Sequence, residues 1–511
     1  MSYPFNSLYE MVLSQGEKQS RRVALFVDKE KIPYREMLSR IDSFAGYLHS
    51  IGIKEGDSVA LFLRNSPEFI IAIFAISKVG AISVPINTFL KSTELKYILE
   101  DSSTKLLIAS SVYEDVVLDA IIEDISPTVV WEGGIGNSAA NDISFEDTLS
   151  LKLNVDPIHR TLDDVAVIIY TSGTTGRPKG AMLTNKNIFS NCQSSAERIK
   201  VTRRDRSIVF LPMFHSFTLT VGVILFVYVG GSIVVIKSLK PFSNIFRQIL
   251  LKRVTLFIGV PDVYNAIAKA KLPWYFMRFN RLRAFISGAA ALQEHTLVAM
   301  REKFGSAILL EGYGLSEASP VVSVNPLDRP KAKSVGLALK GYEIKIVDED
   351  MVELARGEVG DIITRGDNIM RGYLNRPGST EEVIVNGWLL TGDMGYMDDD
   401  GYLYIVDRKK DLIISKGINI YPREIEEVID RFDGVSASAV VGRADEKSGE
   451  IPIAYIELDD DIDSIDIAKL RNYLREHLAN YKIPKSIKVL ENIPKNATGK
   501  VLKRELREEL K

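Results

Sequence analysis

The sequence predicts an α/β protein: a large N-terminal domain of parallel-rich α/β sheets plus a small β-barrel, followed by a small α+β C-terminal domain. Three observations support this prediction. Short apolar runs alternate with helical segments from residue 58 to residue 311, glycine-punctuated strands follow over residues 336–408, and two amphipathic helices mark the remainder. With 511 residues, the chain can bury a large core in several domains.

Valine, isoleucine and leucine form short runs that are nearly continuous rather than alternating with polar residues. Such runs are typical of strands buried on both faces, and the helical segments between them favour largely parallel sheets. A helix is predicted over residues 66–79. The predicted strands cover residues 58–63, 81–85, 105–109, 165–170, 208–212, 255–260, 283–287 and 308–311.

The longest uncharged stretch, residues 217–236, approaches the length of a membrane span. Gly230 and Gly231 interrupt it. Because a span needs about 20 apolar residues without such a break, we expect a buried helix, a Gly-Gly turn and a buried strand over residues 232–236.

The domain boundary is predicted near residue 408, which gives an N-terminal domain over residues 1–407 and a C-terminal domain over residues 408–511. Pro422 is expected near the first turn of one C-terminal helix. A second helix is expected from residue 467, where leucines recur at helical spacing.

Charge and cysteine content exclude some functions. The chain has 64 Lys+Arg against 67 Asp+Glu, and this balance gives no overall attraction to nucleic acid. The only cysteine, Cys192, can form neither an internal disulfide nor a thiolate zinc site by itself. No basic segment followed by an apolar one opens the chain, so we expect a cytoplasmic protein without a signal peptide.

A glycine- and hydroxyl-rich loop follows the predicted strand over residues 165–170. Its sequence, TSGTTGRPKG, offers backbone and hydroxyl donors and one lysine, which suits a polyphosphate. It matches neither the Walker nor the dinucleotide-binding glycine pattern. The residues expected to contact phosphate are Thr171, Ser172, Gly173, Thr174, Thr175, Gly176 and Lys179.

This loop resembles the phosphate loop of the adenylate-forming superfamily, which includes acyl-CoA synthetases, coumarate-CoA ligases, amino-acid adenylation domains and firefly luciferase. Six further motifs occur in the family's order and span nearly the whole chain. They are LPMFHSF from residue 211, SGAAAL from 287, EGYGLSE from 311, WLLTGD from 388, DRKKDLIISKG from 407 and NATGK from 496. The stretch over residues 407–427 is most similar to bacterial medium- and long-chain fatty acid–CoA ligases.

The resemblance implies an AMP-forming acid–thiol ligase. A carboxylate attacks the α-phosphorus of ATP and gives acyl-AMP and pyrophosphate, after which the thiol of CoA displaces AMP. The first step brings two anions together, so it needs Mg²⁺, cations and oriented donors around the transferring phosphorus.

The resemblance also assigns roles around ATP. Glu317 is similar to the carboxylate that binds magnesium, a role in which the loop over residues 171–175 would support it. Lys179 is similar to a catalytic cation. Tyr313 is similar to the residue that stacks on adenine, and Asp393 to the residue that accepts the ribose hydroxyls. The other expected ATP- or AMP-binding residues are Gly288, Ala289, Glu311, Gly312, Gly314, Ser316 and Arg408. The family usually has threonine where Ser316 stands.

Lys500 is similar to the lysine that contacts the carboxylate and α-phosphate oxygens during adenylation. Lys410 stands at the family's hinge position. By analogy the C-terminal domain rotates about Lys410 after adenylation and delivers the segment that lines the CoA tunnel. That segment is Ser415, Lys416 and Gly417.

His215 stands in a region where amino-acid adenylation domains usually carry an aspartate for the substrate ammonium. The resemblance therefore favours an acid without an α-amino group, with His215 bordering the acyl pocket. The pocket segments, residues 214–221, 260–264 and 288–290, are mostly apolar. Each added CH₂ contributes about 0.8 kcal/mol in such a pocket, so a medium- or long-chain fatty acid is the first expectation and an aryl acid the second.

Three alternatives stay open: a fatty acyl-AMP ligase that loads a carrier protein, a luciferase-like oxygenase, and a non-catalytic acyl- or nucleotide-binding regulator. The compact spacing from Gly360 to Asp393 gives no sign of the insertion that the acyl-AMP ligases carry, and Lys179, Glu317 and Lys500 argue against the regulator. The expected partners are a carboxylic acid, ATP and CoA. Peripheral membrane contact and a homodimer are compatible with the sequence.

Overall fold

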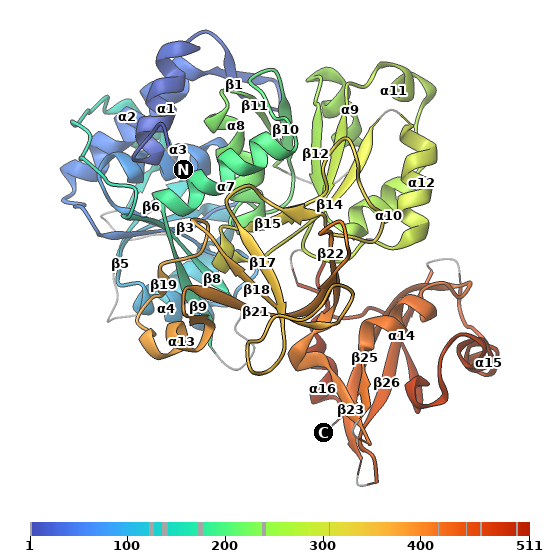
Figure 1. The fold of residues 1–511 in the computed structure, drawn as a ribbon. Coiled ribbons are helices and arrows are strands. Elements are labelled where there is room, and N and C mark those ends of the chain that lie inside the picture. The colour runs from blue at the N-terminus through green and yellow to red at the C-terminus, as the bar shows by residue number, and fades with distance from the viewer. Residues whose placement is uncertain are drawn as a thin grey trace.

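A computed structural model describes residues 3–121, 127–134, 142–171, 177–237, 242–305, 307–416, 418–445, 447–459, 462–496 and 499–510. The chain forms a large N-terminal α/β part and a smaller C-terminal α+β part, which Figure 1 shows in orange and red below the large part. The predicted fold class is confirmed in this respect.

The first large sheet has eight strands in the order β19-β9-β8-β4-β3-β5-β6-β7. In the part of this order that runs from β8 through β4, β3, β5 and β6 to β7, all neighbouring strands are parallel. β9 pairs antiparallel with β8 and with β19. The predicted strands at residues 58, 81, 105 and 165 all lie here. The strands are β3 (Ser58–Phe62), β4 (Ile82–Pro85), β5 (Thr104–Ser110), β6 (Thr128–Glu132), β7 (Ile143–Ser144), β8 (Val165–Thr171), β9 (Lys179–Thr184) and β19 (Gly372–Tyr373).

The second large sheet has nine strands in the order β16-β15-β14-β13-β12-β10-β11-β1-β2. Its centre, from β14 to β1, is parallel. The strands are β1 (Val23–Val27), β2 (Glu30–Pro33), β10 (Arg206–Val209), β11 (Ser232–Val235), β12 (Leu256–Gly259), β13 (Ala284–Ser287), β14 (Ile308–Gly314), β15 (Val321–Val324) and β16 (Leu337–Ala338).

Helices cover these sheets. The apolar helix α3 (Pro67–Lys78) is almost entirely buried, and Ser66 caps it by accepting a hydrogen bond from the Phe69 amide at 3.2 Å. The others are α1 (Leu8–Lys18), α2 (Tyr34–Ser50), α4 (Ser92–Asp101), α5 (Glu114–Ala120), α6 (Phe145–Ser150), α7 (Asn185–Arg198), α8 (Leu225–Tyr228), α9 (Ser243–Leu251), α10 (Pro261–Lys269), α11 (Trp274–Phe279), α12 (Glu294–Phe304) and α13 (Pro377–Val383).

The uncharged stretch over residues 217–236 is buried, as predicted, but it begins as a π-helix, Thr218–Ile224, that continues into α8. Gly230 then turns the chain with φ of +70°, and a Cβ there would lie 1.8 Å from Gln19 Nε2. β11 follows. Within the part of the chain that the structure describes, no helix is long and apolar enough to cross a membrane.

Residues 343–408 form the predicted antiparallel structure, in the order β17-β18-β21-β20 with β22 beside β21. This is the region of the predicted small β-barrel; in the described residues the strand path does not close on itself, and Val335 and Gly336 bond to Leu403 at the outer edge of β22. The strands are β17 (Glu343–Val347), β18 (Gly360–Arg365), β20 (Ile384–Val385), β21 (Trp388–Met397) and β22 (Leu403–Arg408).

The C-terminal part has one mixed sheet, β24-β23-β26-β25, with β27 parallel to β26. As predicted, Pro422 opens a helix and leucines of the next helix enter the core beneath it. The strands are β23 (Ile413–Ser415), β24 (Ile418–Ile420), β25 (Val435–Asp445), β26 (Gly449–Leu458) and β27 (Ser486–Leu490), and the helices are α14 (Pro422–Ile429), α15 (Ile467–His477) and α16 (Lys503–Glu508).

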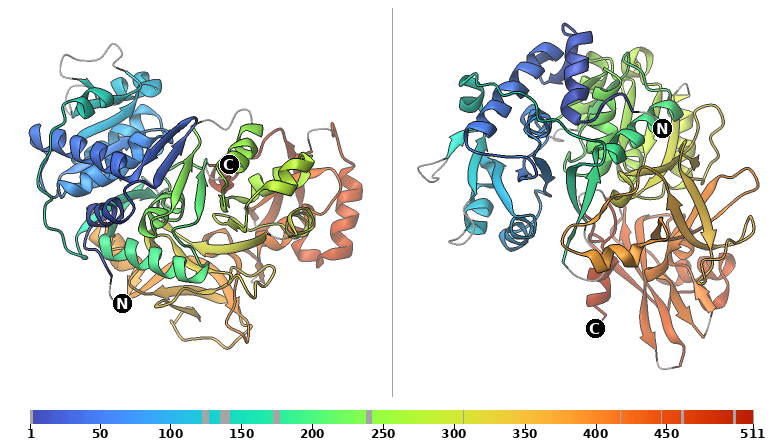
Figure 2. Two further views of the ribbon diagram at one scale, coloured as in Figure 1. Left: turned by 90° about the horizontal axis from the view of Figure 1, so that it is seen from above. Right: turned by 60° about the vertical axis from the view of Figure 1, so that its left-hand side comes forward.

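The two parts meet beside β14 and β22, where Figures 1 and 2 show the C-terminal part packed against the large part. Because β10, β12, β13 and β14 run parallel, their carboxyl ends lie at one edge of the nine-stranded sheet. Ligands of open α/β folds bind at this kind of edge.

Candidate active site

Glu317 lies where the two large sheets meet. It follows β14 in a 3₁₀ turn, Ser316–Ala318, and its carboxylate accepts hydrogen bonds from the Tyr373 hydroxyl at 2.8 Å and the Thr171 hydroxyl at 3.5 Å. Thr171 ends β8, and Tyr373 arrives on β19 through its pairing with β9. Burial and the Glu317 charge raise the pKa of Tyr373, so its proton stays in place to hold the carboxylate.

Lys179 lies beside the same tyrosine. Its ammonium is 5.3 Å from the centroid of the Tyr373 ring and donates a hydrogen bond to Ser379 Oγ at 2.9 Å. Thr171 and Lys179 face each other across β8 and β9, at the two ends of the predicted phosphate loop. The remaining loop residues of that prediction, Ser172, Gly173, Thr174, Thr175 and Gly176, lie outside the described residues.

Asp393 forms a second cluster of polar groups. It is buried on β21, accepts a hydrogen bond from the Tyr313 hydroxyl at 2.6 Å, and pairs with Arg408 Nε at 3.1 Å. Arg408 is its register partner on β22. Burial and the Asp393 charge together hold the pKa of Tyr313 well above its ordinary value. Asp393 therefore contacts both of the other residues assigned to adenine and ribose.

Two glycines of the predicted nucleotide site permit close packing. A Cβ at Gly314 would lie 2.0 Å from the Pro320 carbonyl oxygen, and a Cβ at Gly288 would lie 3.1 Å from the Phe217 ring. Ala289 has φ of +71°, so the chain after β13 is sharply turned. Ser316 shares a hydrogen bond of 3.0 Å with Ser216, which links the EGYGLSE motif to the LPMFHSF motif.

Glu311 is buried beneath the SGAAAL segment. The Leu292 amide donates to its carboxylate at 3.3 Å, and burial raises its pKa to about 7. In this position the carboxylate holds the turn that carries Gly288 and Ala289.

Lys500 reaches the Asp393 cluster from the C-terminal part. Burial and the charges of Arg408 and Lys410 lower its pKa to about 8, against the opposite effect of Asp393 and Asp411. Its loop is closed by two hydrogen bonds with Asn496, at 2.8 and 2.9 Å.

Several contacts hold the C-terminal part in this position. Gln293 Nε2 donates to Asp430 Oδ2 at 2.6 Å, and Lys269 pairs with Asp459 at 2.8 Å. Longer pairs join Lys495 to Asp262 at 3.8 Å and Arg431 to Glu294 at 3.9 Å. Burial raises the pKa of Asp430 to about 7, although Ser438 and Gln293 donate to it.

The predicted hinge and CoA segment lie apart from one another. Lys410 is exposed in a 3₁₀ turn, Lys409–Asp411, beside the cluster around Lys500. Ser415 ends β23 and pairs with Gly449 at the start of β26, and the next residue, Lys416, has φ of +51° and donates its amide to the Ser448 carbonyl at 2.7 Å. Gly417 lies outside the described residues. In this position the structure does not bring Ser415 and Lys416 to the nucleotide residues.

His215 lies half-buried beside aromatic rings. The Phe214 ring centroid is 5.2 Å from it, and Phe89 lies edge-on to Phe214 at 6.4 Å. Burial lowers the pKa of His215 to about 4, so the imidazole is neutral at pH 7.

Tyr373 and Ser379 were missed by sequence reasoning, because neither lies in a recognised motif. Only the pairing of β19 with β9 and the position of α13 bring them to Glu317 and Lys179. Among the described residues, no group of three or more His, Cys, Asp or Glu side chains could hold a metal ion.

Comparison with known proteins agrees with this geometry. A family described as AMP-binding enzyme matches residues 13–374, and its C-terminal domain matches residues 424–500. A long-chain-fatty-acid–CoA ligase of Salmonella typhimurium is 33% identical over 99% of this chain and 95% of its own, and a feruloyl-CoA synthase of Amycolatopsis is 34% identical over 93% of each. ATP-bound MatB from Rhodopseudomonas palustris superposes with a TM-score of 0.90 at 31% identity and 99% coverage of both chains. The chain therefore belongs to the AMP-binding enzyme family, whose adenylate-forming members share this large N-terminal and smaller C-terminal domain.

Proposed function

We propose that this protein is an AMP-forming acyl-CoA synthetase that converts a medium- or long-chain fatty acid, ATP and CoA into acyl-CoA, AMP and pyrophosphate. One observation supports the proposal most strongly: Lys500 is near enough to the paired Asp393 and Arg408 for their charges to act on it, and Gln293 bonds to Asp430 between its domain and the large part. The similarity to a long-chain-fatty-acid–CoA ligase and to ATP-bound MatB agrees with it. We further propose a cytoplasmic location.

In the proposed adenylation step, Lys179 and the loop after Thr171 bind the phosphates, and Tyr313, Asp393 and Arg408 hold the nucleoside. Lys500 donates to oxygens of the α-phosphate and the substrate carboxylate as negative charge develops there. A preformed cation in a water-poor site stabilises that charge more than water can.

The oxygen donors around Glu317 fit Mg²⁺. A carboxylate with two hydroxyls beside it, next to the phosphate loop, is the hard-oxygen environment that this cation takes, and bound phosphates and waters would complete the set. When bound, Mg²⁺ would neutralise charge on the phosphate oxygens. Tyr373 and Thr171 orient the Glu317 carboxylate toward this role.

Replacing Glu317 by glutamine should slow adenylation and raise the Mg²⁺ concentration needed for half-maximal rate by about tenfold or more. A neutral amide is a poorer ligand for a hard cation. Tyr373→Phe removes one hydrogen bond to the carboxylate but keeps the ligand, so a smaller shift is expected. A magnesium titration of pyrophosphate release measures both variants. An unchanged titration in Glu317→Gln would exclude Glu317 as the ligand.

The pH dependence of adenylation follows from Lys500. Its pKa of about 8 lies below the ordinary value, so the ammonium is charged below pH 8 and loses its proton as the pH rises through 8. Because the charged form is the active one, kcat/KM for acyl-AMP formation should fall above about pH 8. Lys500→Arg keeps its charge at these pH values and should remove this decline from whatever activity remains. A wild-type profile that rises from pH 8 to 9 contradicts the role.

The acyl specificity rests on the surroundings of His215. The imidazole is neutral and lies against aromatic rings, and the Phe217 ring lies against Gly288 in the same region. These features favour an apolar acyl group. In the proposal CoA is the acceptor, and after adenylation the C-terminal domain rotates about Lys410 to bring the Ser415–Lys416–Gly417 segment to the site.

A second candidate is an aryl-CoA ligase, which the similarity to a feruloyl-CoA synthase favours. A panel of carboxylic acids, scored for pyrophosphate and AMP release with and without CoA, tests the proposal. Palmitate should give the fastest CoA-dependent AMP release and ferulate a slow one. Ferulate exceeding palmitate would establish the aryl ligase. Acyl-AMP that accumulates whether or not CoA is added would point to a ligase that loads a carrier protein. No pyrophosphate release with any acid would overturn the enzymatic proposal.

A further inference from the structure

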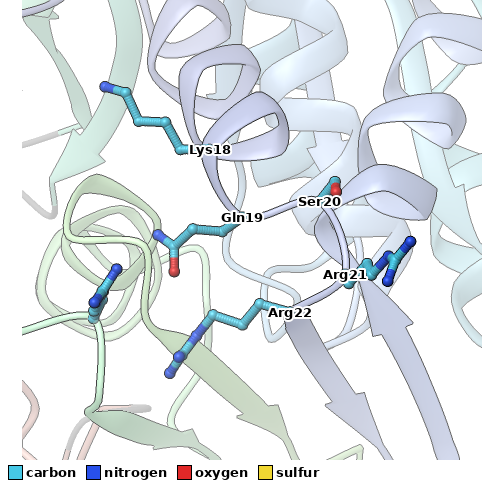
Figure 3. Close-up of a pocket in the computed structure, with 6 residues that line it drawn as sticks. Lys18, Gln19, Ser20, Arg21 and Arg22 are labelled. Carbon is cyan, nitrogen blue, oxygen red and sulfur yellow. The ribbon is translucent and has the colours of Figure 1, made fainter.

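A basic pocket opens on the large part, between the end of α1 and the turn before β10. It has a volume of about 320 Å³ and is lined by Lys18, Gln19, Ser20, Arg21, Arg22 and Arg203. Figure 3 shows Lys18, Gln19 and Arg22 extending to one side of the connection from α1 to β1, whereas Arg21 points away. Four of the six lining residues are cations and none is an anion.

The cations of this pocket lack carboxylate partners. Among the residues that the structure describes, no ion pair to an acidic side chain involves Lys18, Arg22 or Arg203, and Arg22 Nε is buried without a hydrogen-bond acceptor. Asp205 is close in sequence, but its carboxylate already binds Arg283, at 2.8 and 3.1 Å, and Thr255. A buried guanidinium donor without an acceptor costs free energy.

The like charges also act on one another. Burial and the charge of Arg203 lower the pKa of Arg22, and burial with the charges of Arg22 and Arg253 lowers that of Arg206. Arg206 and Lys252 flank the Phe26 ring at 5.0 and 5.5 Å, next to this row of cations. An anion between these groups would relieve the repulsion.

We propose that this pocket binds a phosphate group, held by the guanidinium groups of Arg22 and Arg203 with the ammonium of Lys18. The paired N–H donors of a guanidinium group match the oxygens of a phosphate. The two negative charges of phosphate balance several cations better than the single charge of a carboxylate does. The phosphate comes either from a small soluble anion or from the headgroup of a phospholipid.

The pocket is separate from the proposed active site. Arg22 directly precedes β1 and Arg203 lies just before β10, so the pocket lies at the amino ends of these parallel strands. The acyl and nucleotide segments follow the carboxyl ends of the same sheet. The site is therefore additional to the one that holds ATP.

The test compares two exposed neighbours in the full-length protein. Arg203→Gln removes a pocket cation, and Arg204→Gln makes the same charge change one residue away, outside the lining. Inorganic phosphate is titrated by calorimetry, with chloride keeping the ionic strength constant. Sedimentation with phosphatidylcholine vesicles, with and without phosphatidic acid, forms the second arm.

Arg203→Gln should weaken phosphate binding by about tenfold or more, and Arg204→Gln by less than about twofold. Binding to phosphatidic acid vesicles that is lost in Arg203→Gln and displaced by free phosphate would identify a lipid headgroup. Absence of vesicle binding would identify a soluble anion. Equal phosphate affinity in Arg203→Gln and wild type, or equal weakening in both variants, would overturn the proposal. AMP release in phosphate-free buffer should be the same in all three proteins. The outcome of the phosphate-binding test therefore does not depend on which acid the enzyme activates.

Discussion

Replacing Lys500 by alanine should lower the rate of acyl-AMP formation by about 10²–10³-fold. The structure holds this ammonium in a half-buried position near the charges of Asp393 and Arg408, where the proposed transition state develops negative charge. A lost contact of about 3–4 kcal/mol in such a site corresponds to this decrease. Pyrophosphate release with palmitate, ATP and Mg²⁺ measures it.

The second half-reaction provides the control for this variant. Transfer of the acyl group from supplied acyl-AMP to CoA should stay near the wild-type rate in Lys500→Ala, because Lys500 acts only in adenylation. Lys485→Ala, which removes an exposed lysine of the same domain, should leave both steps unchanged. Equal losses in both half-reactions of Lys500→Ala would show that the lysine supports the fold rather than the first step.

Replacing Lys410 by proline should reduce CoA transfer far more than adenylation. Lys410 lies within the 3₁₀ turn Lys409–Asp411. The 3₁₀ conformation takes φ of about −50 to −70°, which is close to the −65° that proline imposes. The present position, with Lys500 in the site, is therefore compatible with proline at residue 410. Some loss of adenylation is expected because proline disfavours the helical conformation of Lys409 before it. A rotated position needs a different backbone conformation, which proline prevents.

Lys410→Ala distinguishes backbone freedom from side-chain chemistry. Alanine keeps φ free, so both half-reactions should change little. Each half-reaction is measured separately, with acyl-AMP supplied for the second. If proline slows neither step, or if alanine is as damaging as proline, residue 410 is not a backbone pivot.

The sequence predicted most of the parallel strands because their apolar runs are local signals. It also predicted that Thr171, Lys179, Glu317, Asp393 and Lys500 belong to one site, because each lies in a family motif. The structure brings Thr171 to Glu317, Lys179 to the Tyr373 that binds Glu317, and Lys500 to the Asp393 cluster. The catalytic and binding roles of these residues remain predictions.

Other features depend on long-range pairing that no local pattern contains. Tyr373 reaches Glu317 only because the two-residue strand β19 pairs with β9, almost 200 residues earlier in the chain. The small β-barrel was predicted from glycine-punctuated strands, but the pairing of Val335 and Gly336 with Leu403 joins residues almost 70 positions apart, which no local pattern contains. Propensity likewise could not show that residues 218–224 form a π-helix, since the residue types are the same as those of a buried α-helix.

The attack of the substrate carboxylate on the α-phosphorus of ATP is tested directly by following the carboxylate oxygens. Palmitate labelled with ¹⁸O in both carboxylate oxygens is incubated with the enzyme, ATP, Mg²⁺ and CoA, and the products are analysed by mass spectrometry. Attack on the α-phosphorus transfers one labelled oxygen into AMP, leaves pyrophosphate unlabelled and keeps the other label in the acyl-CoA carbonyl. Label in inorganic phosphate, or formation of ADP, would show attack at the γ-phosphorus and contradict the account.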